Sequence, residues 1–285
     1  MNIDASKLSP GLYLIATPIG TARDITLRAL DILTQADVLA AEDTRSLQKL
    51  LQIHGIGLNG RPLISYHDHN GAKARPRILT HLEADKSVVY ASEAGTPMVA
   101  DPGFDLARAA VEAGYKLVSA PGPSAVITAL TLSGLPTDQF FFAGFLPSSS
   151  GKRMAALDAL RTVPGTLVFY ESANRLAAML ADAAVVLGEG RDCVVCRELT
   201  KKFEEVQRGS LSKLVQYAKE KTLKGEIVVL IDRISREDVS ESELDAALYQ
   251  ALEKMSVRDA AEFVANQYAL KKRQVYQRAL QLSKT

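Results

Sequence analysis

The chain has 285 residues, of which 47% are hydrophobic and 24% are charged, and this composition is typical of a globular protein that buries a sizeable core. The formal net charge is +1, which excludes a uniformly basic nucleic-acid-binding protein, so any contact with an anionic polymer has to be local. The first residues lack the pattern of a signal peptide, no apolar run is long enough for a bilayer, and only two cysteines are present, so we expect a protein of the reducing cytoplasm without a membrane span.

Strand-like and helix-like segments alternate along most of the chain, which predicts α/β sheets with helices on both faces. Five strand-like runs precede Pro121 and about five follow it, so two five-stranded sheets fit the length better than one wide sheet. A short link joins the runs at 193–199 and 203–209, which predicts a mixed second sheet. We expect one α/β domain over residues 1–120 and a second over 121–235, with a cleft between them.

The character of the sequence changes after Asp232. Residues 233–243 are polar and are interpreted as a linker, and a basic helical extension is predicted over 236–285. Ser256 is a suitable N-cap for one helix, and a second helix begins near Lys271. From Lys254 onward, two acidic residues stand against seven basic ones, which are Lys254, Arg258, Lys271, Lys272, Arg273, Arg278 and Lys284. This pattern fits a helix-turn-helix that contacts RNA, and it also fits helices whose charges only keep them solvated.

Special backbone residues follow several of the predicted strands. The first strand ends in TPIG (17–20), and the run at 87–91 is followed by SEAGTPMVADPG (92–103), a loop rich in proline and glycine. APGPSA (120–125) repeats this composition. Open α/β sheets bind ligands at the carboxyl ends of their strands, so these segments predict a binding site lined by loops of fixed shape.

Ionisable residues follow other strands. AEDTR (41–45) places Glu42, Asp43 and Arg45 at a strand end, where either Asp43 or Thr44 also suits the N-cap of the next helix. HDHN (67–70) and FYES (169–172) add two histidines and Glu171. Because no further ligand cluster accompanies the histidines, we expect no metal site. The sequence also lacks a G-x-G-x-x-G fingerprint, and residues 148–153 (SSSGKR) do not match a phosphate-binding loop. We interpret 148–153 as a flexible, basic loop that caps the next helix.

The segments TPIG, AEDTR, HDHN, SEAGTPMVADPG, APGPSA, GFLP, FYES, RELTK and GEIVVLI occur in this order between residues 12 and 231. Together they resemble the tetrapyrrole-methylase fold family, and more narrowly its branch of bacterial 16S ribosomal RNA (cytidine-2'-O)-methyltransferases. The basic tail is similar to the C-terminal extension of that branch. The resemblance implies S-adenosylmethionine as methyl donor, small-subunit ribosomal RNA or the 30S subunit as substrate, and a homodimer.

The resemblance also implies roles for individual residues. The implied donor contacts are Ile19, Gly20, Thr96, Val99, Ser124, Ala125, Tyr170, Leu199 and Glu226. Two positions depart from the family pattern, because Thr21 stands where an asparagine is common and Ala173-Asn174-Arg175 replaces a threonine-histidine-arginine run.

Transfer to a ribose 2'-hydroxyl requires a group that accepts its proton. The candidates are Glu42, Asp43, His67, Asp68 and Glu171, of which we favour the acidic residues Glu42, Asp43 and Glu171, because burial can tune carboxylates at strand ends. The cations expected to hold RNA phosphates are Arg45, Lys152, Arg153, Arg175, Lys271, Lys272 and Arg273. Two other hypotheses stay open: a methyltransferase of the same fold that acts on a tetrapyrrole or a protein, and a non-catalytic RNA-binding protein.

Overall fold

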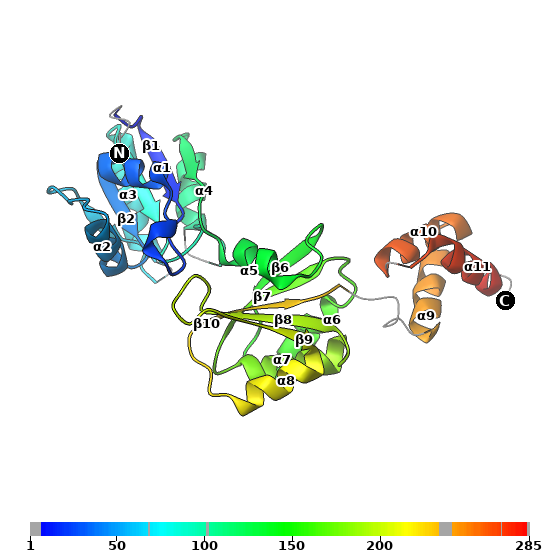
Figure 1. The fold of residues 1–285 in the computed structure, drawn as a ribbon. Helices are drawn as coiled ribbons and strands as arrows, with labels where there is room; N and C mark the ends of the chain where they lie inside the picture. The colour runs from blue at the N-terminus through cyan, green and yellow to red at the C-terminus, as the bar shows by residue number, and fades with distance from the viewer. Residues whose placement is uncertain (1–6, 68, 101–102, 234–240, 269, 284–285) are drawn as a thin grey trace. The chain divides into compact units, whose positions relative to one another are not determined.

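The computed structural model describes residues 7–67, 69–100, 103–233, 241–268 and 270–283 (Figure 1). The chain divides into two compact units, one formed by residues 1–128 with 199–202 and the other by 129–198 with 203–285. This division falls inside helix α5 (Ala125–Ser133), and the predicted domain limits at 120 and 235 stay predictions. Asp68 and Asp101 lie outside the described residues.

The first unit contains a parallel sheet with strand order β3-β2-β4-β1-β5. Its strands are β1 (Gly11–Ile15), β2 (Val38–Ala41), β3 (Leu63–Ser65), β4 (Ser87–Ala91) and β5 (Leu117–Ala120). The central strands β1, β2 and β4 are buried along their whole length. This burial explains why they read as continuous apolar runs rather than as alternating ones.

Helices cover both faces of this first sheet, as predicted. They are α1 (Leu27–Gln35), α2 (Thr44–Ile53), α3 (Gly71–Glu83) and α4 (Phe104–Glu112), with a short 3-10 helix η1 (Ala22–Asp24) before α1. Successive residues of a strand point to opposite faces, so Ile15 packs in a core with α1 and α2, whereas Leu14 packs in a core with α3 and α4.

The second unit contains a mixed sheet with strand order β6-β7-β10-β8-β9. Its strands are β6 (Phe140–Phe145), β7 (Thr166–Ser172), β8 (Asp192–Arg197), β9 (Glu205–Ser210) and β10 (Glu226–Ile231). Only β6 and β7 pair in parallel, and β8 and β9 form the antiparallel pair that the short link predicted. Helices α6 (Ser150–Ala159), α7 (Leu176–Leu187) and α8 (Leu211–Glu220) share one apolar core with this sheet.

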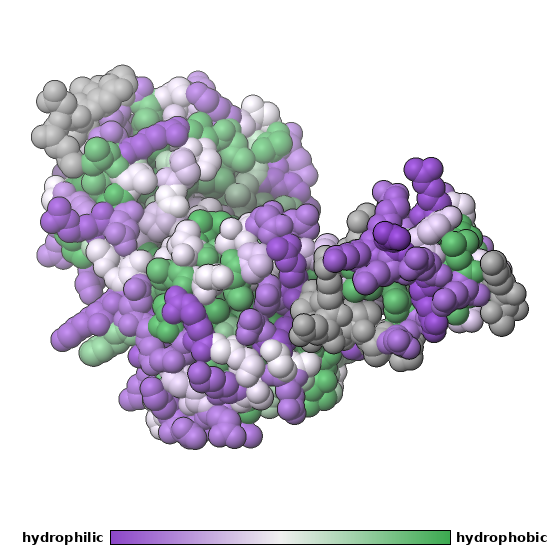
Figure 2. All heavy atoms as spheres, turned by 45° about the vertical axis from the view of Figure 1, so that its right-hand side comes forward, coloured by the Kyte–Doolittle hydropathy of each residue, from purple (hydrophilic) through white to green (hydrophobic). Residues whose placement is uncertain are grey.

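The C-terminal segment forms three helices, α9 (Glu241–Leu252), α10 (Val257–Gln267) and α11 (Lys272–Leu282), around a small core of their own. Ser256 caps α10 as predicted, because its hydroxyl accepts a hydrogen bond from the Asp259 amide at 3.2 Å. The two predicted helices are α10 and α11, and the sequence analysis missed a third helix, α9, which begins inside the supposed linker. Figure 2 shows mostly hydrophilic side chains on the face of this bundle that is in view.

Candidate functional site

The loops that follow β1 and β4 are joined at the carboxyl edge of the first sheet. The Thr17 amide donates to the Gly95 carbonyl and the Gly95 amide donates to the Thr17 carbonyl, both at 2.9 Å. The Thr17 hydroxyl donates to the Ser92 carbonyl at 3.2 Å, and the Ser92 hydroxyl donates to the Gly95 carbonyl at 2.6 Å. Because Thr17 and Ser92 are both buried, these bonds are shielded from water and hold the two loops in one shape.

A third loop, which follows β5, is attached to the same edge. The Thr96 hydroxyl donates to the Pro123 carbonyl at 3.0 Å. Gly95 has a φ of +79°, and a Cβ added there would lie 3.3 Å from the Ile19 side chain. The turn after β1, the loop after β4 and the loop before α5 therefore converge, and they bring Ile19, Thr96 and Ser124 to one edge; their contact with the donor stays a prediction.

The loop after β4 contains two ordinary residues in the left-handed region, Met98 with a φ of 68° and Ala100 with a φ of 54°. A residue with a side chain pays roughly 1–3 kcal/mol for such a conformation, and structures retain it chiefly at ligand sites. Val99 lies between these two residues, and its amide faces the Thr96 carbonyl at 3.4 Å. Two of the six described non-glycine residues with a positive φ thus lie in the loop predicted to contact the donor.

Residues 199–202 approach the turn after β1. The Thr21 amide donates to the Thr200 hydroxyl at 3.1 Å, and the Thr21 hydroxyl donates to the Thr200 carbonyl. A Cβ on Gly20 would lie 2.6 Å from both Lys201 Cγ and Thr200 Oγ1, so glycine is required there by close packing. Thr21, which replaces the family's asparagine, therefore ties this turn to residues 199–202.

A hollow of about 510 Å³ opens beside the carboxyl ends of β2, β3 and β4. The structure brings Glu42, Asp43, Arg45 and His67 together there, as the strand-end positions of AEDTR and HDHN indicated. The other lining residues are Thr44, Ser65, His69 and Glu93. Sequence reasoning named His69 only as one of two histidines and Thr44 only as an alternative N-cap. It did not single out Ser65 or Glu93, although Glu93 lies only two residues beyond β4, in the same position relative to its strand as Asp43 has to β2.

Asp43 is held by Arg45 and by the start of α2. Its Oδ1 accepts from the Arg45 amide at 2.8 Å, and its Oδ2 lies 3.1 Å from Arg45 Nη2. These hydrogen bonds lower the pKa of Asp43 and raise the pKa of Arg45. The N-cap interpretation of Asp43 is therefore confirmed. Both oxygens of its carboxylate accept hydrogen bonds from Arg45.

The two histidines of the hollow are neighbours, with ring centroids 6.0 Å apart. The His67 amide donates to Asn70 Oδ1 at 2.9 Å, which fixes the backbone between β3 and α3. Within the described ranges, His, Cys, Asp and Glu form no group of three or more suited to a metal ion.

Glu171 lies in the second unit, at the end of β7, where it is 3% exposed. Its Oε1 accepts from the Ser172 amide at 2.7 Å and lies 3.2 Å from Arg175 Nε, while its buried Oε2 has no hydrogen-bond partner. The Arg175 guanidinium also donates to the Leu146 carbonyl. Glu171 and Arg175 therefore form a shielded pair that connects β7, α7 and the loop after β6.

The two remaining predicted donor residues also lie in the second unit. Tyr170 packs edge-on against the rings of Phe142 and Phe145, with centroids 4.8 and 5.7 Å away. The Glu226 amide donates to Glu198 Oε1 at 3.0 Å, and the Glu198 amide donates to the Glu226 carbonyl at 2.9 Å.

The predicted RNA-contacting cations fall into two kinds. Lys152, Lys271 and Arg273 are exposed, whereas Arg153 is 4% exposed and its Nη2 lies 2.7 Å from Asp182 Oδ2. From the sequence, residues 148–153 were interpreted as a flexible basic loop. In the structure, the last four of them form the start of α6. Arg153 is thus held inside the fold, and the prediction that it contacts phosphates was wrong, because its guanidinium does not reach the surface.

Comparison with known proteins places these features in a family. Residues 11–215 match the model of the tetrapyrrole (corrin/porphyrin) methylases, and residues 238–283 match the RsmI C-terminal HTH domain. A Mesorhizobium japonicum protein named ribosomal RNA small subunit methyltransferase I is 44% identical over 99% of this chain and 96% of its own length. A protein of the same name from Escherichia coli O157:H7 is 42% identical over 95% of this chain and 94% of its own.

Solved structures share the fold at low sequence identity. Cobalt precorrin-4 methyltransferase superposes with a TM-score of 0.59 at 19% identity, covering 78% of this chain and 94% of that one. Diphthine synthase superposes with a TM-score of 0.60 at 16% identity, covering 80% and 91%. No described helix has both the length and the apolar character that a membrane crossing needs.

The fold and the sequence matches agree. The loops converge at the strand ends of one sheet, a second mixed sheet follows, and the chain ends in a helical domain. The chain belongs to the tetrapyrrole methylase family, in the group of the ribosomal RNA small subunit methyltransferase I proteins.

Proposed function

We propose that the chain transfers the methyl group of S-adenosylmethionine to the ribose 2'-oxygen of a cytidine in 16S ribosomal RNA. The observation that carries this proposal is the convergence of the turn 17–21, the loop 92–99 and the loop 120–125 at one sheet edge, in a chain whose full-length relatives are named for small-subunit ribosomal RNA methylation. The proposal includes a homodimer, as the resemblance implies, and action in the cytoplasm, as the sequence analysis predicts.

The loops of the first unit suit a donor that must be held rather than activated. Ile19 and Leu199 are buried and supply apolar surface at this edge. Gly95 and Met98 both adopt left-handed backbone conformations, which set the course of the loop at this edge. When bound, S-adenosylmethionine supplies an electrophilic methyl group on a cationic sulfur. A related fold, uroporphyrin-III C-methyltransferase, has been solved in complex with S-adenosyl homocysteine.

Tyr170 and Glu226 would complete the donor contacts from the second unit, together with Ser124 and Ala125 at the start of α5. These roles rest on the resemblance. When donor and ribose are both bound, orientation supplies most of the rate of methyl transfer. The translational and rotational entropy of bringing the reacting atoms together has then already been lost on binding.

We assign the removal of the 2'-hydroxyl proton to Glu42, with His67 beside it in the hollow. Asp43 is a poorer choice, because its ion pair with Arg45 lowers its pKa and fills its oxygens. Glu171 is also poorer, because it is buried and paired with Arg175. Both residues are better understood as groups that position α2 and the end of β7.

RNA would be held by exposed cations. Arg45 stands at the mouth of the hollow with its side chain 88% exposed, so it could pair with a phosphate next to the reacting ribose. Lys152, Lys271, Lys272 and Arg273 would hold more distant parts of the RNA. Because such remote contacts orient the ribose, an isolated cytidine should be a poor substrate.

The decisive experiment incubates the purified protein with labelled S-adenosylmethionine and either 16S ribosomal RNA or 30S subunits. A ribose 2'-O-methyl group blocks alkaline cleavage of the next phosphodiester, so the modified residue can be mapped. We expect methylation at a cytidine and none of a porphyrinoid offered in parallel. Incorporation into the porphyrinoid, or donor binding without transfer to RNA, would refute the proposal.

The assignment of Glu42 is tested by Glu42→Gln, with Glu83→Gln, an exposed position on α3, as the matched control. General base catalysis contributes typically 10²- to 10⁴-fold, so Glu42→Gln should lower the single-turnover rate by about that factor. Calorimetry should find the same donor affinity as in the unmodified chain. A normal rate in Glu42→Gln would shift the assignment to His67.

A further inference from the structure

The C-terminal helical bundle contains a pocket of about 410 Å³ between α9 and α10. This volume lies within the range of small-molecule sites, roughly 300–1,000 Å³. One wall is formed by Ala246, Ala247 and Ala251 of α9, whose small side chains leave room above the helix. The pocket lies wholly within the bundle and shares no residue with the hollow at the first sheet.

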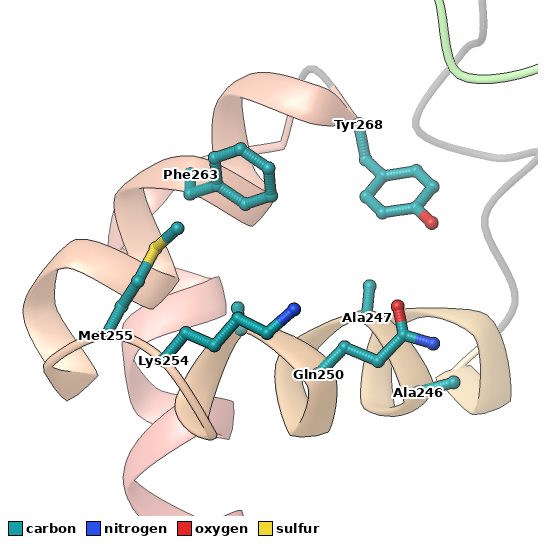
Figure 3. A pocket seen from close by; sticks show the side chains of 8 residues that line it. Ala246, Ala247, Gln250, Lys254, Met255, Phe263 and Tyr268 are labelled. Carbon is teal, nitrogen blue, oxygen red and sulfur yellow. The ribbon is translucent and has the colours of Figure 1, made fainter.

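Aromatic and thioether side chains line the opposite wall. Figure 3 shows the rings of Phe263 and Tyr268 on one side of the pocket, facing Gln250 and Lys254 on the other, with Met255 beside Phe263. Phe263 is 51% exposed and Met255 is 39% exposed. Neither is needed to fill the core of the bundle, which is made by residues such as Leu248, Val264 and Val275. An exposed apolar patch with a polar rim marks a binding surface more often than a packing feature.

The surroundings of the pocket favour an anionic ligand. Two bundle cations are already paired, Lys272 with Glu262 and Arg278 with Asp245. Among the described residues of the bundle, the cations without an ion pair are Lys254, Arg258, Lys271 and Arg273. Of these, Lys254 lines the pocket itself.

We infer that this pocket takes an unpaired nucleobase of an RNA loop, a conclusion that rests on the proposed function. A base has an apolar face and a polar edge, and its backbone is anionic. Phe263 and Met255 offer the apolar surface on which the face stacks, the Gln250 amide can pair with the edge, and the Lys254 ammonium attracts the adjacent phosphate. An apolar peptide would offer no polar or anionic partner to the Gln250 amide and the Lys254 ammonium in this pocket.

The test measures binding of the full-length protein to two RNA probes of equal length, a hairpin with an unpaired loop and a fully paired duplex. Removing one base–aromatic stack should weaken hairpin binding by roughly 5- to 150-fold, so Phe263→Ala should lose hairpin affinity within that range and keep duplex affinity. Phe263→Trp should restore hairpin binding, because it restores a stacking surface. The matched control is Tyr249→Ala, an exposed aromatic residue of α9 that does not line the pocket.

A second variant guards against misfolding. Gln250 is exposed on α9, so Gln250→Glu preserves the helix and adds a negative charge to the pocket, and it should also weaken hairpin binding selectively. A hairpin carrying 4-thiouridine in its loop should photo-crosslink to peptides from residues 246–268. Equal hairpin affinity in Phe263→Ala and the unmodified chain would overturn the inference, and so would crosslinks that fall only outside this segment.

These outcomes separate the inference from the proposed function. If the protein methylates 16S ribosomal RNA and Phe263→Ala binds the hairpin normally, only the pocket assignment fails. That result is also the one expected if the pocket takes a side chain of a ribosomal protein, because naked RNA would then not use it. If the unmodified chain does not methylate RNA, the proposed function fails, whereas selective loss of hairpin binding would still support a base-binding pocket.

Discussion

Arg153 and Asp182 join α6 to α7 through an ion pair in which the arginine is buried and the aspartate is partly exposed. Arg153 Nε donates to Asp182 Oδ2 at 2.7 Å, and Arg153 Nη1 donates to the Ser148 carbonyl at 2.9 Å. Ser150 donates to both oxygens of the same carboxylate. One aspartate on α7 thus fixes the first turn of α6 and the segment before it, which is the part of the chain that sequence alone suggested was a mobile basic loop.

We predict that Arg153→Ala destabilises the second unit by about 1.5–3 kcal/mol, because it removes the charged hydrogen-bond partner of Asp182, whose side chain is 17% exposed. The control is Lys152→Ala, whose side chain is exposed at the neighbouring position. Lys152→Ala should leave stability unchanged but reduce the salt dependence of RNA binding by about one counterion. Urea denaturation and binding at several salt concentrations measure the two effects. A stable Arg153→Ala with weakened RNA binding would restore the original interpretation of Arg153.

This ion pair illustrates what sequence could not supply. The strands were predictable because β1, β2 and β4 are continuous apolar runs, buried on both faces of a sheet. The partner of Arg153 is 29 positions away on another helix, and no local pattern connects them. Because Arg153 lies in a serine-rich segment, the sequence predicted an exposed side chain there.

Helix α9 was missed for a different reason. Its first residues, Glu241 and the two after it, continue a polar stretch that resembles a linker, and the apolar positions begin only at Leu244 and Leu248. Those positions have helical spacing, but the polar residues before them led us to interpret the segment as a linker. Part of the hollow at the first sheet could be predicted from the sequence, because Glu42, Asp43 and His67 all directly follow strands. Glu93 was overlooked because the glycines and prolines around it dominated the interpretation of that loop.

Gly20→Ala should disrupt the donor-binding edge. The new methyl group would lie 2.9 Å from the Leu199 carbonyl as well as close to Thr200 and Lys201, so the turn and residues 199–202 must move apart. We expect a loss of about 1–3 kcal/mol in stability from overpacking and at least a tenfold weaker affinity for S-adenosylmethionine, measured by calorimetry. Gly190→Ala is the control, because a Cβ there meets nothing within 4 Å. Unchanged donor affinity in Gly20→Ala would show that this turn does not form the donor site.

Glu205 should make the second unit sensitive to acid. Burial by itself would raise the pKa of Glu205, but hydrogen bonds from Gln207, Arg197 and Tyr217 and the nearby Lys221 ammonium outweigh it and lower the pKa to about 2. A carboxyl whose pKa falls on folding stabilises the fold above its unfolded value of about 4.5. That stabilisation is lost as the pH falls from about 4.5 toward 2.

The corresponding variant is Glu205→Gln, which keeps the shape of the side chain and removes the charge. We expect it to be about 1–2 kcal/mol less stable than the unmodified chain at pH 7. The difference should shrink as the pH approaches 2 in urea titrations. Glu189→Gln, at an exposed position of the same unit, should show no such pH-dependent difference. A difference between Glu205→Gln and the unmodified chain that stays constant with pH would mean that the ion pairs of Glu205 do not stabilise the fold.

Cys193 and Cys196 should be unreactive in the folded protein. They lie three positions apart on β8, so their side chains point to opposite faces of the sheet, and both are buried. Burial raises the pKa of the Cys196 thiol to about 12 and raises that of Cys193 further. Because the thiolate is the reactive form, a disulfide-exchange reagent at pH 8 should label neither thiol in the native protein and both in denaturant. Rapid labelling of the native protein, or a disulfide between the two after mild oxidation, would show that β8 does not hold them apart as the sheet requires.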